Sequence, residues 1–71
     1  MKTRITTLRR IANRLGFSVY PQSGGWVLSA RKTENLHYSV TTERAALLVG
    51  LQRAAEGDLL TADESDAVAN A

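Results

Sequence analysis

The sequence contains no cysteine and only one histidine, and these absences narrow the chemistry open to it. Without cysteine there is no disulfide framework of the kind that small secreted domains use, no thiolate nucleophile and no zinc–thiolate cluster. A reducing, cytoplasmic setting is the simplest expectation.

Long apolar runs are also missing. The longest, Ala45 to Leu51, is about a third of the length that a membrane-spanning helix needs. The first seven residues, MKTRITT, lack the apolar core of a signal peptide. We therefore expect a soluble protein that is not exported.

The size of the chain limits it to one domain. Its 71 residues are 44% apolar and 23% charged, which are ordinary values for a globular protein. A domain this small buries only about 60% of the surface that its unfolded chain exposes. We expect residues 1–60 to form one domain, followed by a short helix or a frayed tail over residues 61–71.

Charge is segregated along the chain. Every charged residue up to Thr33 is basic, seven in all, whereas the chain from Glu34 onward carries seven acids and only Arg44 and Arg53 as bases. The halves are therefore +7 and −5, and the sum is the net charge of +2. Such asymmetry indicates either an anionic partner or two halves that neutralise each other when they fold together.

Apolar periodicity predicts two helices and a weaker third. Residues 4–15 repeat at helical spacing, with Thr3 as the expected N-cap and Gly16 as the C-terminal stop. A second helix is expected from Thr42 to a left-handed stop at Gly57. The segment from Thr61 has the form of a capping box and predicts a short third helix to about residue 70.

Between the first two helices, alternating patterns predict three strands over residues 17–20, 26–32 and 36–40. Pro21 to Gly25 is expected to be the hairpin loop. Short connections require an antiparallel meander. The predicted fold is thus a small α+β domain of order α-β-β-β-α, with two helices on the sheet face that carries Val19, Leu28, Tyr38 and Val40. We also expect a core made of Leu8, Ile11, Leu28, Leu47 and Leu51.

This order of elements also occurs in double-stranded-RNA-binding domains and in small toxin ribonucleases. The first would carry a lysine-rich start of the second helix, where this chain has TERAA. The second would carry Gly-Ser-His at the start of the second strand, where this chain has SGGW. Neither family is indicated.

Catalytic and metal-binding patterns are not found. His37 lies in a predicted strand with no acid beside it, so a surface histidine is a better interpretation than a general base near Ser29 or Ser39. The acids from Asp58 to Asp66 lack the spacing of a calcium loop, and no helix follows Gly24-Gly25 as in a phosphate-binding loop. We expect no enzyme activity, no metal and no cofactor.

Two surfaces are candidates for binding an anion or a nucleic acid. On the first helix, Arg9, Arg10 and Arg14 project away from the apolar stripe and form what we call the arginine ridge. On the sheet face opposite the helices, Tyr20 and Arg31 would suit base stacking and phosphate contact. Both surfaces are equally well described as ordinary solvated faces. The other residues expected on that sheet face are Ser18, Val27, Ser29, His37 and Ser39.

A protein interface is predicted on the second helix and at the hairpin. The projection that buries Leu47 and Leu51 leaves small side chains facing outward, namely Ala45, Ala46, Val49 and Gly50 together with Arg53. This patch would contact a second copy or another protein, unless the C-terminal segment folds back over it. Trp26, beside the glycines, is either a core anchor or an exposed anchor for a partner.

The sequence thus leaves two functions open. The first is a non-enzymatic protein-interaction module, a regulatory or adaptor protein of a size found on mobile genetic elements, with a protein partner or a second copy in a homodimer. The second is a small nucleic-acid-binding protein that uses the arginine ridge and Arg31.

Overall fold

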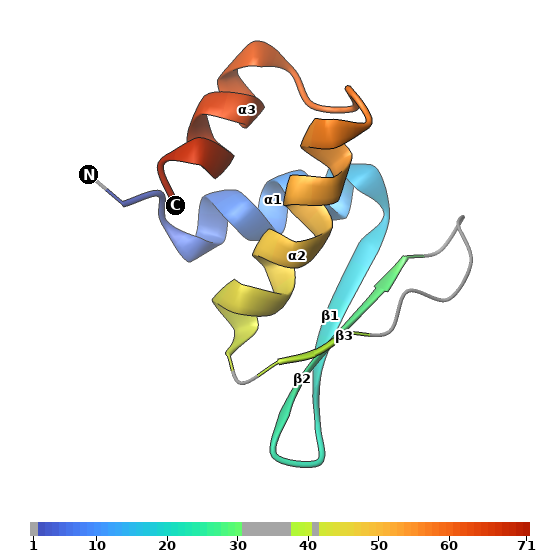
Figure 1. The fold of residues 1–71 in the computed structure, drawn as a ribbon. Coiled ribbons are helices and arrows are strands. Elements are labelled where there is room, and N and C mark those ends of the chain that lie inside the picture. Colours follow the sequence, from blue (N-terminus) through green and yellow to red (C-terminus); the bar gives the residue numbers. More distant parts are fainter. Residues whose placement is uncertain (1, 31–37, 41) are drawn as a thin grey trace.

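The computed structural model describes residues 2–30, 38–40 and 42–71 and has three helices and short antiparallel strands (Figure 1). It confirms a small, compact α+β fold. No helix among these residues is long and apolar enough to cross a membrane. In chain order the elements are α1 (Ile5–Leu15), β1 (Phe17–Gln22), β2 (Gly25–Ala30), β3 (Tyr38–Val40), α2 (Glu43–Glu56) and α3 (Ala62–Ala69).

Three predicted helix boundaries are confirmed. Gly16 ends α1 with a left-handed φ of 82°, a conformation that glycine adopts without a steric cost. The Thr42 hydroxyl caps α2 by accepting the N–H of Ala45 at 3.1 Å. At α3, the Thr61 hydroxyl accepts the Glu64 N–H at 3.2 Å, and the Glu64 carboxylate accepts the Thr61 N–H at 2.9 Å, which completes the capping box.

Two predicted capping details are wrong, although α1 begins within one residue of the predicted start and α2 ends at Gly57 as predicted. The helix α1 begins at Ile5 with Arg4 at the N-cap, and the Thr3 hydroxyl instead donates to the carbonyl of Ala67 in α3. Thr3 was expected to cap α1, but its contact is made across the fold. At the end of α2 the left-handed residue is Asp58, with φ 62°, whereas Gly57 has φ −85°. Aspartate tolerates this conformation better than most residues do.

The strands β1 and β2 form a tighter hairpin than expected. Only Ser23 and Gly24 lie in the turn, and both have positive φ, 47° and 80°, as a type I′ turn requires. The predicted loop from Pro21 to Gly25 is therefore too long, because Pro21 pairs with Trp26 within the ladder. Proline is tolerated here because β1 is an edge strand.

The sheet has the order β1-β2-β3, and both pairings are antiparallel. Leu28 in β2 lies opposite Val19 of β1 and Tyr38 of β3. The strand β3 has only three residues, and residues 31–37, which include the predicted turn before it, lie outside the described part of the chain. The complete meander over residues 17–40 therefore stays a prediction.

Helix α2 is the centre of the molecule, because it contacts both other helices and all three strands. Towards α1 and α3 it contributes to an apolar cluster, and Val68 brings α3 into that cluster. All five predicted core residues are confirmed as buried, none more than 3% exposed. The buried members of the cluster are Leu8, Ile11, Ala12, Leu47, Leu51 and Val68.

A neighbouring part of the α2 surface lies against the sheet. A side-chain carbon built on Gly50 would come within 2.9 Å of a Leu28 methyl and 3.2 Å of the Phe17 ring, so the strands approach the helix backbone closely at this point. Two helices were expected to cover the sheet, but only α2 does so. Helix α1 contacts β1 alone among the strands, because it packs mainly on α2.

Candidate functional site

The arginine ridge points away from the core, as expected, but two of its three members are engaged within the fold. Arg9 binds Glu43, in the first turn of α2, through two hydrogen bonds. The Arg9 Nε donates at 2.7 Å and Nη2 at 2.6 Å to the two carboxylate oxygens. This bidentate contact lowers the pKa of Glu43 and raises that of Arg9.

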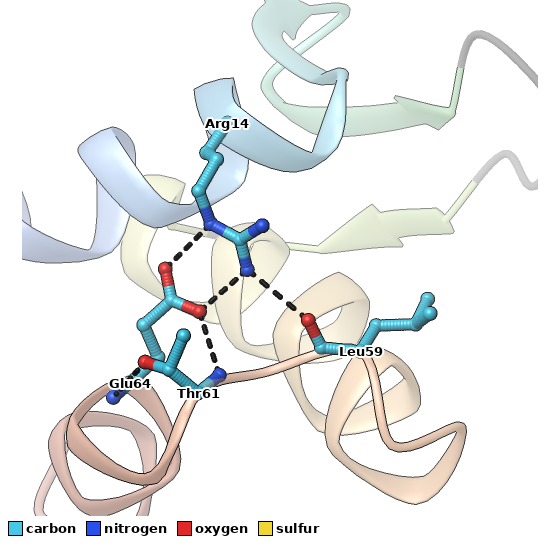
Figure 2. A network of polar contacts seen from close by, with 4 residues as sticks. All are labelled: Arg14, Leu59, Thr61 and Glu64. Carbon is cyan, nitrogen blue, oxygen red and sulfur yellow. Dashed lines mark hydrogen bonds and ion pairs between the residues drawn. The ribbon is translucent and has the colours of Figure 1, made fainter.

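Arg14 makes the same kind of contact with α3, as Figure 2 shows. Its Nε and Nη2 donate to the two Glu64 carboxylate oxygens at 2.7 and 2.5 Å, and Nη2 also donates to the Leu59 carbonyl at 3.1 Å. The hydrogen bonds from Arg14, and next the Thr61 N–H, lower the pKa of Glu64 to about 2. One carboxylate therefore joins α1 to the start of α3 and also caps α3.

These contacts bring the basic first half and the acidic second half of the chain together. Two ridge arginines each face an acid, whereas Arg10 is exposed and Arg31 lies outside the described residues. The partners are 34 and 50 residues apart in sequence, so no local pattern could pair them. This favours mutual neutralisation over a free cationic surface.

Sequence reasoning also missed a junction at the N-terminal segment. The Thr3 N–H donates to the Asn70 carbonyl at 3.1 Å, and the Thr3 carbonyl accepts Nη2 of Arg44 at 2.7 Å. Nη1 of Arg44 is buried and has no hydrogen-bond partner within the described residues. Thr3 thus joins the start of α2 to the end of α3, and both chain termini lie on this side of the molecule (Figure 1).

The predicted small-residue patch on α2 does not face outward. Ala46 is fully buried, Gly50 is buried against Leu28, and Val49 is half-buried. The projection was wrong because the buried part of the helix surface is wider than expected: it packs on the sheet as well as on α1. Among the patch residues only Arg53 is exposed, so no continuous outward surface exists there.

After the arginine ridge and the α2 patch, the remaining candidate surface is the outer face of the β1–β2 hairpin. Tyr20 is 39% exposed and lies opposite Val27, and Ser18 lies opposite Ser29. These residues alternate with Val19 and Leu28, so they occupy the sheet face opposite α2. Val27 itself is 7% exposed, so this face is not uniformly open, contrary to expectation. Arg31 and His37, predicted for the same face, lie outside the described residues.

The tip of this hairpin extends beyond the helices (Figure 1). An open hollow of about 370 Å³ lies there. Trp26 is half-buried and contributes to its wall beside Pro21, its cross-strand partner. The hollow is lined by Pro21, Gln22, Ser23, Gly24, Gly25 and Trp26.

The described part of the chain holds no group of three or more histidine, cysteine or acidic residues placed to bind a metal ion. Comparison with protein families, curated proteins and solved structures found no match.

Proposed function

We propose that this protein is a small, non-enzymatic protein-interaction module, regulatory or adaptor in kind, that binds its partner through the β1–β2 hairpin. The observation that carries the proposal is a hairpin that extends from the body of the fold, with an exposed Tyr20 on its outer face and a hollow beside the half-buried Trp26 at its tip. Tyrosine and tryptophan are among the residues most enriched where binding energy concentrates in protein interfaces.

The charge distribution supports the same surface. Residues 17–30, which form the hairpin, contain no charged side chain, although 16 of the 71 residues in the chain are charged. Charged residues are depleted at the centres of protein interfaces, because charges are costly to remove from water. A neutral, aromatic hairpin beside charged helices therefore suits a partner that buries it.

The nucleic-acid alternative has less support. Phosphate contact by Arg9 or Arg14 would compete with a bidentate carboxylate that each already binds. Of the arginine ridge, Arg10 alone has no such carboxylate among the contacts described. On duplex DNA, each phosphate contact contributes about −0.9 to the slope of log K against log salt concentration, so a single contact provides little binding.

The test is affinity capture from a lysate of the native host, with and without nuclease. The wild-type chain should retain a protein partner after nuclease treatment, and Tyr20→Ser should lose it. Gln52→Ser, at an exposed position on α2, is the matched control and should retain it. Capture that disappears with nuclease, or oligonucleotide binding below about 100 μM at low salt, would support the alternative instead.

A further inference from the structure

We infer that the free edge of β1 binds an extended segment of the partner as an additional antiparallel or parallel strand. This inference depends on the proposed function and specifies the kind of partner. It differs from docking on the outer sheet face, which would use the side chains of Tyr20 and its neighbours without forming backbone hydrogen bonds to β1.

The first observation is that β1 is an edge strand with little protection from Phe17 to Tyr20. In the described sheet β1 pairs with β2 alone, and it is six residues long. Natural edge strands commonly carry a lysine, a proline, an inward-pointing charge or a bulge that prevents strand addition, or are covered by a helix or loop. Of these features β1 has Pro21 near the turn, and α1 contacts the strand. Phe17 to Tyr20 has no charge and pairs with β2 in continuous register.

The second observation is the position of Pro21. The two-residue turn makes Gln22 and Gly25 the first pair of the ladder, and hydrogen-bonded and non-bonded pairs alternate from there. Counting from the turn, Pro21 and Trp26 form a pair without backbone hydrogen bonds between them. The backbone groups of residue 21 therefore face the free edge, where the missing N–H of proline breaks no hydrogen bond of the ladder. Val19 and Phe17 lie two and four positions from Pro21 on the same strand and so occupy pairs of the same kind. They therefore direct their backbone N–H and C=O groups to that edge.

The side chains beside this edge indicate which residues the added strand of the partner should carry. Phe17 and Val19 are half-buried against the core on the helix side, and Tyr20 and Ser18 lie on the outer side. Because successive residues of a strand alternate between the two faces, an added strand would place apolar residues beside Phe17 and Val19 and polar or aromatic residues beside Tyr20. The partner segment is therefore extended, uncharged at its centre and apolar at every second position.

The experiment uses 12-residue peptides selected from a random display library on the full chain, with binding measured by fluorescence polarisation. The amides of Phe17 and Val19 should exchange with deuterium at least tenfold more slowly when a selected peptide is bound, because those N–H groups become hydrogen-bonded. Val19→Pro removes one outward N–H and should weaken binding about tenfold. Val19→Ala controls for the lost side chain and should weaken it less.

A lysine at Ser29, on the outer face of the central strand, separates the two modes of docking. Strand addition predicts that Ser29→Lys binds within about threefold of wild type, whereas docking on the outer face would be abolished. The inference is overturned if no selected peptide slows exchange at Phe17 and Val19, or if Ser29→Lys abolishes binding while Val19→Pro does not. A dimer that forms without peptide and dissociates in Val19→Pro would assign the edge to a second copy. Should Val19→Pro not fold, the exchange measurement on the wild type decides alone.

Discussion

Replacing Gly50 by alanine tests the close approach of α2 to the sheet. The added carbon would lie 2.9 and 3.2 Å from the two Leu28 methyl carbons and 3.2 Å from a Phe17 ring carbon. Leu28 is fully buried and cannot move into solvent. Overpacking of this kind costs about 1–3 kcal/mol, whereas the better helix propensity of alanine returns about 1 kcal/mol. We expect a net loss of about 1 kcal/mol.

Gly57 provides the matched control at the end of the same helix. An added carbon there meets nothing closer than 3.6 Å, and its φ of −85° suits alanine. Gly57→Ala should stabilise the fold by about 0.5 kcal/mol, because it restricts the unfolded chain. Urea unfolding followed by far-ultraviolet circular dichroism measures both free energies of unfolding. If Gly50→Ala has the same free energy of unfolding as Gly57→Ala, the close contact between Gly50 and Leu28 is contradicted.

A double-mutant cycle with Leu28→Ala identifies the cause of the loss. Leu28→Ala alone should cost about 2–5 kcal/mol, because it leaves a cavity between β2 and α2. In that background Gly50→Ala should destabilise less, since both Leu28 methyl groups are gone and only the contact with the Phe17 ring at 3.2 Å remains. The two changes should therefore be non-additive by at least about 0.5 kcal/mol, and additivity would refute the contact.

Three further predictions concern the core and the polar contacts. Leu51→Ala should cost about 2–5 kcal/mol in urea unfolding, whereas Leu59→Ala, at a site 59% exposed, should stay within about 0.5 kcal/mol of wild type. Thr3→Val should lower the free energy of unfolding by about 1 kcal/mol and speed hydrogen exchange in α3, because the Ala67 carbonyl loses its donor. Thr6→Val, at an exposed position of α1, is the control. Glu64 has a lower pKa in the folded state than its ordinary 4.5, so its contribution to stability is present above that value and is lost as the pH falls towards about 2. Glu64→Gln keeps the capping box but should remove that part of the pH dependence, and an unchanged acid unfolding curve would contradict the pairing with Arg14.

Much of the fold could be predicted because its signals are local. The threonines at positions 42 and 61 and Gly16 each act within one helical turn, and the apolar spacing of residues 5–15 lies within one helix. The sequence therefore contains the information that places these elements. The same is true of the alternation in β1 and β2. The turn was predicted too long because nothing local distinguishes a strand that continues through Pro21 from one that stops before it.

The errors arise where the contact is distant. The helical projection assigned α2 a narrower buried side than it has. Ala46 and Gly50 are buried as well, and Gly50 lies against the sheet, which α2 contacts in addition to its contact with α1. The small size of these residues was the available signal, and it indicates close approach by any neighbour, including one from the same chain. In the same way, the arginine ridge could be located on α1, but its partners Glu43 and Glu64 could not be identified without the fold.

Site-specific photo-crosslinking most directly tests the claim that the β1–β2 hairpin binds a protein partner. A photoreactive amino acid would replace Tyr20 on the hairpin in one variant and Gln52 on α2 in another, and both would be irradiated in nuclease-treated lysate of the native host. We predict a discrete protein adduct from position 20 and none from position 52. An adduct from position 52 alone, or none from position 20, would contradict the account.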